Sequence, residues 1–162
     1  PNKIVYACLS PRTNIFLLDR FCLLMNYQLV SFFSTDQNNK EIYHTNVMMA
    51  IADKYAVVCL ESIRDEDKRN EVIHSLENSG KEIIEISFDQ VLQFAGNMLQ
   101  VEGSGGQKYM VMSERAYNSL SKEQINAIEM YDKILSIPIN NIEKYGGGSV
   151  RCMMAEVFLP KK

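Results

Sequence analysis

The sequence predicts an α/β fold built from a repeated unit of strands and helices. Three observations carry this prediction. The 162 residues, 46% hydrophobic and 23% charged, fit one soluble globular domain with a sizeable core. Short apolar runs alternate with longer segments of helical periodicity. Similar segments then recur along the chain at a nearly constant spacing, which is typical of a modular architecture.

Nine strand-like runs and three helices are expected. The second and third helices begin with capping residues, Asp65 and Ser121, and Gly80 follows the second helix where a C-cap belongs. The helices cover residues 14–26, 65–78 and 121–132. The strands cover residues 4–9, 28–33, 46–52, 55–60, 82–87, 97–101, 109–112, 134–139 and 150–159.

The predicted hairpins repeat with a period slightly above 50 residues. Their second strands begin at Lys3, Lys54 and Lys108, with offsets of 51 and 54 residues. Because both apolar pattern and spacing repeat, we expect three ββαβ units rather than unrelated strands of similar length. The repeat units cover approximately residues 3–45, 46–96 and 97–148, and a last strand covers 149–159.

One first strand is missing from this pattern. The first strands begin at Asn46, Asn97 and Cys152, with offsets of 51 and 55 residues. The unit that begins at Lys3 has only its second hairpin strand, and the last strand has no second strand after it. We therefore expect residues 1–162 to be the C-terminal portion of a longer domain, beginning in the middle of a unit.

Composition argues against several classes of protein. The net charge is −3, the pI is about 5.5, and Lys and Arg are scattered, so no basic stripe for nucleic acid is expected. No apolar run approaches the roughly 20 residues that cross a membrane. The four cysteines form no C-x-x-C pair, so neither a metal site nor another cofactor is expected. Unpaired cysteines and nine methionines indicate a reducing, cytoplasmic location.

Two residues stand out as candidates for chemistry. Cys152 follows three glycines, 146–148, and the cation Arg151, which would favour its thiolate. His44 lies at a loop-to-strand junction, where functional residues collect, whereas His74 sits on a predicted helix surface. The glycines also fit a flexible turn, and His44 also fits a surface or capping residue. Cys8 and Cys59 lie in apolar runs and are expected to be buried thiols.

The repeat places these candidates together. If the units are arranged around an axis, the equivalent positions Asn46, Asn97 and Cys152 converge at a common centre, with His44 at its mouth. A thiolate and an imidazole in a polar centre form a plausible covalent site. We therefore predict Cys152 and His44 as catalytic residues and Asn46 and Asn97 as substrate-binding residues.

Four motifs carry a resemblance to a known family. They are LSPRTN at 9–14, IYHTNVMMAI at 42–51, FAGNMLQV at 94–101 and GGGSVRCMMAEVFLPKK at 146–162. With them the chain resembles the pentein superfamily of guanidino-group-modifying enzymes over nearly its whole length. It is most similar to amidinotransferase-related proteins of citrulline metabolism, and more distantly to arginine deiminases and dimethylarginine dimethylaminohydrolases.

The resemblance implies a pentein-type α/β propeller of five ββαβ modules, of which about three are present. Cys152 would attack the central carbon of a small-molecule guanidino or ureido substrate, and His44 would shuttle protons. The carboxylates that grip the guanidinium would come from missing N-terminal modules, upstream of Pro1. The chain departs from arginine deiminases in carrying Asn46 where they have Asp and Pro11 where they have Glu.

Several alternatives stay open at this point. The fold could serve a non-catalytic binding or assembly protein, which would not need a reactive Cys152, or an unrelated Cys–His hydrolase such as a peptidase. Arginine, methylated arginine, citrulline-like ureas and agmatine-like amines all fit as substrates, by hydrolysis or by amidino transfer. The unpaired strands at 3–9 and 150–159 could pair with each other in one chain, giving a closed ring, or in a homodimer.

Overall fold

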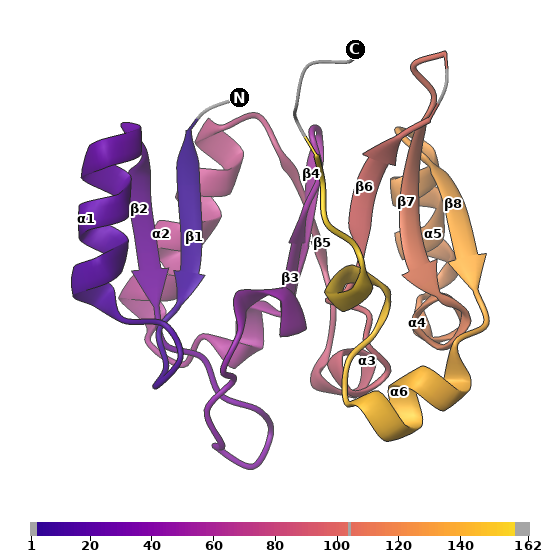
Figure 1. Ribbon diagram of the computed structural model, residues 1–162, viewed down its shortest axis with the longest axis horizontal. Coiled ribbons are helices and arrows are strands. Elements are labelled where there is room, and N and C mark those ends of the chain that lie inside the picture. Colours follow the sequence, from indigo (N-terminus) through magenta and orange to yellow (C-terminus); the bar gives the residue numbers. More distant parts are fainter. Residues whose placement is uncertain (1–2, 104, 158–162) are drawn as a thin grey trace.

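The structure is a computed structural model that describes residues 3–103 and 105–157. Three strand–helix units lie side by side (Figure 1). The first consists of β1 (Ile4–Cys8), α1 (Ile15–Met25) and β2 (Gln28–Phe32). The second consists of β3 (Met49–Ile51), β4 (Tyr55–Val58), α2 (Glu66–Asn78) and β5 (Glu82–Glu85). The third consists of β6 (Leu99–Glu102), β7 (Lys108–Ser113), α5 (Lys122–Glu129) and β8 (Lys133–Ile137).

The second and third units share one topology. In each, the central strand pairs antiparallel with the strand before it and parallel with the strand after the helix, giving the orders β3-β4-β5 and β6-β7-β8. The first unit has only the parallel pair β1-β2. The predicted α/β class is therefore confirmed. Within the described residues, β1 keeps one edge without a partner strand.

The three predicted helices form, and local capping explains where they begin. The side chain of Asn14 accepts from the amides of Phe16 and Leu17 at the start of α1, and Ser121 forms a capping box with Gln124 at the start of α5. Shorter elements were not predicted. They are α3 (Phe88–Leu92), α4 (Glu114–Ser119), α6 (Asn140–Gly146), and the 3₁₀ turns η1 (Thr45–Val47), η2 (Leu60–Ser62) and η3 (Val150–Met153).

The predicted last strand, 149–159, is wrong over the residues that the structure describes. Residues Val150–Met153 form η3 and pack against β7, and residues 154–157 join no sheet. A strand is stabilised by the ladder it shares with a neighbour, and residues 150–157 share no ladder with any described strand. The alternative of a ring closed within one chain is also wrong for the described residues, because β2 is the only strand among them that pairs with β1. Residues 158–159 lie outside the described residues. The first strand predicted at 46–52 shrinks to β3, because η1 occupies its start.

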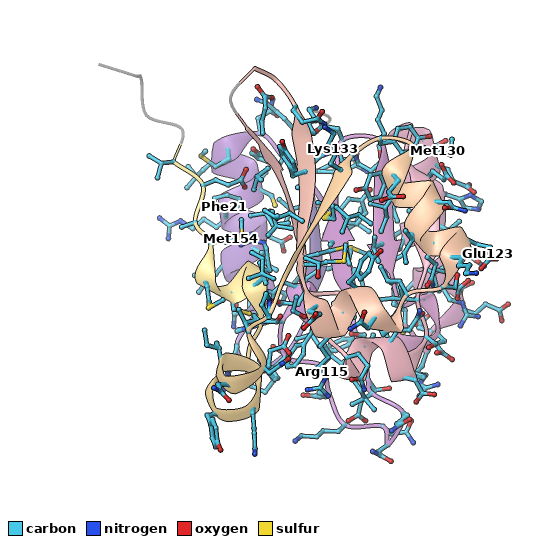
Figure 2. All side chains as sticks on the ribbon, turned by 90° about the vertical axis from the view of Figure 1, so that its right-hand side faces the viewer. Phe21, Arg115, Glu123, Met130, Lys133 and Met154 are labelled. Atoms are coloured by element: carbon cyan, nitrogen blue, oxygen red, sulfur yellow. The ribbon has the colours of Figure 1, made fainter. Side chains whose placement is uncertain are left out.

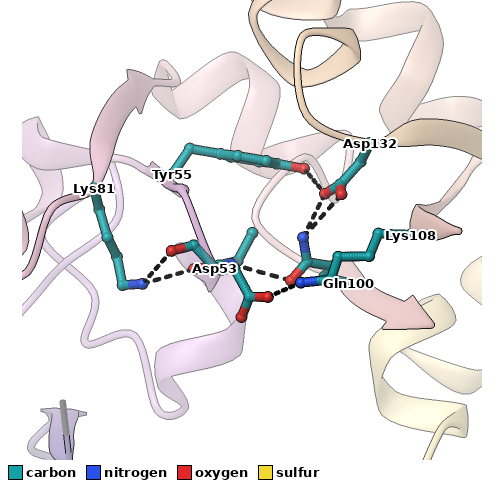
Figure 3. A network of polar contacts seen from close by, with 7 residues as sticks. Asp53, Tyr55, Lys81, Gln100, Lys108 and Asp132 are labelled. Atoms are coloured by element: carbon teal, nitrogen blue, oxygen red, sulfur yellow. Dashed lines mark hydrogen bonds and ion pairs between the residues drawn. The ribbon is translucent and has the colours of Figure 1, made fainter. Parts of the chain in front are cut away.

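One buried apolar cluster runs through all three units, and a polar network joins the second to the third. Buried Asp132 accepts from the hydroxyl of Tyr55 at 2.6 Å and from Gln100 Nε2 at 2.7 and 2.9 Å (Figure 3). Asp53 then donates its backbone amide to Gln100 Oε1 at 3.0 Å and pairs with the Lys108 ammonium. The network fixes the two hairpins relative to each other.

The helices differ in how much apolar surface they leave open. On α5, Ile128 is buried in the core while Glu123 and Met130, which follows the helix, project outward (Figure 2). The helix α1, on the outer side of β2 in Figure 1, buries Cys22 but leaves much larger apolar side chains exposed. Their exposed fractions are 79% for Phe16, 69% for Leu17, 84% for Leu23 and 76% for Leu24. An exposed apolar face of this kind marks a contact surface.

Candidate active site

Three segments that are far apart in the sequence meet at the thiol of Cys152. Nδ2 of Asn97 donates to Cys152 Sγ at 3.2 Å, and Nδ2 of Asn46 lies 3.9 Å from the same sulfur. Nδ2 of Asn97 also donates to the backbone carbonyl of Asn46 at 3.0 Å. Asn97 is 3% exposed, whereas Cys152 is exposed. The structure thus brings together three of the four predicted site residues.

His44 lies on the same segment as Asn46 but does not reach the thiol. Its ring packs edge-to-face against Tyr43, with ring centroids 4.8 Å apart, and its side chain is exposed. Its backbone carbonyl accepts from the amide of Val47 in η1. Within the described residues, no hydrogen bond joins the imidazole to Cys152. An imidazole two residues from Asn46 would need to turn toward the sulfur to act with it.

Gly96 allows Asn97 to lie against Asn46. A Cβ atom at Gly96 would stand 2.4 Å from the carbonyl oxygen of Val47 and 2.9 Å from Cα of Met48, closer than real Cβ contacts come. Only a glycine lets the two backbones approach this closely. Phe94, two residues earlier, adopts φ 65°, which turns the chain into this contact. The sequence FAGN therefore folds as a wedge against η1.

The turn that carries Cys152 is held by its backbone. The amide of Cys152 donates to the carbonyl of Ser149 at 3.0 Å, and the amide of Arg151 donates to Asn97 Oδ1 at 3.1 Å. The guanidinium of Arg151 donates to the carbonyl of Met154 at 3.3 Å. The cation that the sequence placed next to the sulfur is thus bound to a backbone carbonyl. Gly148 lies against the nucleophile candidate, because a Cβ there would be 3.3 Å from Cys152 Sγ.

The residues that fix the His44 segment were not predicted individually. Backbone N of Cys8 donates to Thr45 Oγ1 at 2.9 Å, and Ser10 Oγ donates to the carbonyl of Tyr43 at 2.9 Å. The guanidinium of Arg12 lies over the Tyr43 ring, 4.7 Å from its centroid. The available signal was the LSPRTN motif at 9–14, which directly follows β1 and supplies two of these three contacts.

The other thiols are shielded. All four cysteines are free, and Cys8, Cys22 and Cys59 are buried. Burial raises the pKa of the Cys59 thiol to about 11, and burial also raises the pKa of Cys8. Cys152 is therefore the cysteine that a reagent in solution can reach directly.

Other kinds of site find little support in the described residues. They include no group of three or more His, Cys, Asp or Glu side chains that could hold a metal ion. No helix among them is both long and apolar enough to span a bilayer. A cavity of about 620 Å³ lies between β1 and the turn of the β3-β4 hairpin, with Ile4, Tyr6, Asp53 and Lys81 in its wall. None of the four predicted site residues lines it, so this cavity is not the thiol site.

Comparison with known proteins identifies the family. A family model described as N,N dimethylarginine dimethylhydrolase, eukaryotic, matches residues 1–159. The chain belongs to this family. The dimethylarginine hydrolase match covers both the His44 and the Cys152 segments. No curated protein shows significant sequence similarity to the chain.

Solved structures of other proteins share the fold. The apo structure of an arginine dihydrolase from the ornithine-ammonia cycle in cyanobacteria superimposes with a TM-score of 0.73 at 16% identity, over 98% of this chain and 23% of that one. Its N-terminal domain bound to product gives a TM-score of 0.69 at 15% identity, over 93% of this chain and 50% of that one. The fold is thus of the pentein type. The chain spans about a quarter of the whole dihydrolase and half of its N-terminal domain.

Proposed function

We propose that the chain carries the nucleophilic part of a guanidino-group hydrolase that acts on arginine-like substrates through a covalent thiol intermediate. The observation that carries this proposal is the exposed thiol of Cys152, which accepts a hydrogen bond from the buried amide of Asn97 at 3.2 Å. A hydrogen bond to sulfur favours the thiolate, which is the reactive form. A non-catalytic binding protein has no need of such an arrangement.

The chemistry follows from these groups. The thiolate of Cys152 attacks the central guanidinium carbon and forms a C–S bond, and the C–N bond to the leaving amine breaks as His44 gives that nitrogen a proton. Water then attacks the same carbon and returns a proton to His44. The C–S bond breaks, which releases a ureido product and restores the thiolate. For this role the His44 imidazole turns from Tyr43 toward the sulfur.

The comparisons favour hydrolysis over amidino transfer. The matched family is named for hydrolysis of dimethylarginine, and a structure of the dihydrolase domain is described as covalently bound to a reaction intermediate. That domain resembles this chain with a TM-score of 0.69 at 14% identity. Transfer of the amidino group to an amine would use the same intermediate and stays a prediction. Methylated arginine is the substrate that we propose first, with arginine second.

A guanidinium is cationic at neutral pH, and its binding needs carboxylates. The residues that meet at the thiol are neutral amides, so we propose that the acids come from further N-terminal modules. The open edge of β1 fits this proposal, because the cavity beside Ile4 and Tyr6 offers room for the absent first strand of that unit. A second copy of the chain is the other candidate occupant. Free cysteines throughout favour a reducing compartment, as in the cytoplasm.

A product assay tests the function. The protein is incubated with dimethylarginine or arginine and the ureido product is measured, with Cys152→Ser and His44→Gln variants alongside. We expect slow product formation, well below the usual 1–10³ s⁻¹ of enzymes because the carboxylates are lacking, and its loss in Cys152→Ser. Equal product from the wild type and Cys152→Ser would refute the proposal. Fast turnover would instead show that local acids such as Glu102 or Glu156 bind the guanidinium.

A further inference from the structure

Glu143 is a buried carboxylate whose side chain has one hydrogen-bond partner among the described residues. It lies on α6, is 4% exposed, and accepts a hydrogen bond on Oε1 from the hydroxyl of Ser149 at 2.7 Å. Ser149 is completely buried. Oε2 of Glu143 has no hydrogen-bond partner among the described residues. Burying a carboxylate with an unsatisfied oxygen is costly, so a role beyond packing is expected.

Glu143 stands at one end of the loop that leads to the thiol. Between it and Ser149 lie the three glycines 146–148, and Gly147 adopts φ 68°, which glycine tolerates best. A glycine loop of this kind leaves many positions open to the residues that follow. The position of Cys152 must therefore be set by contacts at the ends of the loop.

Two contacts supply that restraint. On one side, Glu143 holds the side chain of Ser149, whose carbonyl accepts from the amide of Cys152 at 3.0 Å. On the other side, Asn97 Oδ1 accepts from the amide of Arg151. The same Asn97 donates to the sulfur through Nδ2, so the thiol meets its donor only while the turn stays in place.

We propose that Glu143 is a positioning residue for the Cys152 thiol: through Ser149 it fixes the turn so that Sγ accepts the hydrogen bond from Asn97. Calling this thiol a catalytic nucleophile rests on the proposed function, whereas the positioning does not. Glu143 is not proposed to touch substrate. It acts through one neutral hydroxyl and one backbone carbonyl.

The alternative is that a charge on Glu143 acts directly on the Cys152 thiol, which would change the labelling of Cys152 in the opposite direction. The titratable groups on the elements around the turn are Arg151, His44 on the Asn46 segment, Glu143, Lys144 and Tyr145 on α6, and Lys108 and Tyr109 on β7. If Glu143 acted through a negative charge, removing that charge would speed alkylation of Cys152 at pH 7. Loss of positioning weakens the hydrogen bond from Asn97 to the sulfur and slows alkylation. Glu143→Gln removes the charge but keeps an acceptor for Ser149, and it separates the two effects.

The experiment measures the rate of iodoacetamide labelling of Cys152 at pH 7 by peptide mass spectrometry. For Glu143→Ala and Ser149→Ala we expect labelling slowed about threefold to tenfold, the usual worth of one hydrogen bond. Glu143→Gln should stay within about twofold of the wild type, on the same reasoning. Glu129→Ala, which changes an exposed acid on α5 away from the turn, is the matched control and should change nothing.

Buried Cys8 and Cys59 report unfolding in the same samples, because they become labelled only when the fold opens. If Glu143→Ala opens the fold, the labelling of Cys152 in Ser149→Ala decides whether the proposal holds. An unchanged labelling rate in Ser149→Ala, or an equal rise of the rate in Glu143→Ala and Glu143→Gln, would overturn the proposal. The outcome is independent of turnover: the expected slower labelling in a protein that forms no ureido product would support the positioning and contradict the proposed function.

Discussion

At the scale of single residues, two side-chain amides rather than the adjacent arginine meet the thiol of Cys152. Asn97 donates to the sulfur from a buried position, and Asn46 approaches it from η1. Neutral donors can stabilise a thiolate without repelling a cationic ligand, whereas a nearby guanidinium would repel it. The binding of Arg151 to the carbonyl of Met154 therefore fits the proposed guanidinium site.

The cysteines should differ in reactivity. At pH 7, we expect iodoacetamide to modify Cys152 at least about a hundredfold faster than Cys59, because a pKa near 11 leaves about one Cys59 thiol in 10⁴ ionised. Cys8, whose pKa is also raised by burial, and buried Cys22 should be slow as well. Peptide mass spectrometry after a brief exposure measures the four rates. Preferential labelling of Cys59 would contradict the site assignment.

The hydroxyl of Tyr55 should contribute stability that depends on pH. Burial and its hydrogen bond to Asp132 raise the pKa of Tyr55 above its ordinary value of 10, so its contribution is complete below about pH 10 and is lost as the pH rises further. We expect Tyr55→Phe to lower the free energy of unfolding by about 1–3 kcal/mol at pH 8, and by less at pH 10.5.

Urea unfolding at both pH values measures this difference. Tyr145→Phe, an exposed tyrosine, is the matched control and should leave the free energy of unfolding unchanged. A constant deficit of Tyr55→Phe at both pH values would show that the phenol hydroxyl does not titrate with folding.

At the scale of elements, the repeated hairpins were predictable because each central strand is a continuous apolar run. The repeat also brought out Asn46, Asn97 and Cys152, since equivalent positions converge. The repeat wrongly predicted a strand at η3, where the residues keep the apolar pattern of a strand but pair with no described strand. Short helices such as α6 hold too few turns for a periodic pattern, so nothing in the sequence singled out Glu143. Its bond to Ser149 across a glycine loop leaves no mark in local sequence.

The wedge at Gly96 should be intolerant of a side chain. Gly96→Ala would force the backbones of residues 47–48 and 96 apart, and we expect a loss of about 1–3 kcal/mol in the free energy of unfolding. It should also slow labelling of Cys152, because Asn97 moves with the wedge. Gly146→Ala is the control, since its Cβ would make an ordinary contact 3.7 Å from Ile142. Equal stability of the two variants would show that the close approach is not needed.

At the scale of the whole molecule, the helix of the first unit leaves an apolar face that no other described element covers. The helix α2 packs against β2 of the preceding unit as well as against its own β5. The helix α1 has no preceding unit among the described residues, and its apolar face is open. The strand β1 of the same unit keeps an open edge. Strand edges and apolar faces of this kind recruit other chains.

We therefore expect the isolated chain to self-associate. Size-exclusion chromatography with light scattering should show a mass that rises with concentration and exceeds the 18.5 kDa of one chain. The double variant Leu17→Glu, Leu24→Glu should shift the protein toward monomer, whereas Met130→Glu, which changes an exposed residue away from α1, should not. A wild-type protein that stays monomeric at high concentration would show that both surfaces are tolerated in solution.

The most direct test of guanidino chemistry at Cys152 is capture of the covalent intermediate. The protein is mixed with dimethylarginine at tens of millimolar, a concentration that compensates for weak binding, quenched in acid, digested and analysed by mass spectrometry. We predict an adduct on the Cys152 peptide with the mass of the substrate less dimethylamine, and none in Cys152→Ser. An adduct on Cys8, Cys22 or Cys59, or no adduct with dimethylarginine or arginine, would contradict the assignment of Cys152 as the nucleophile.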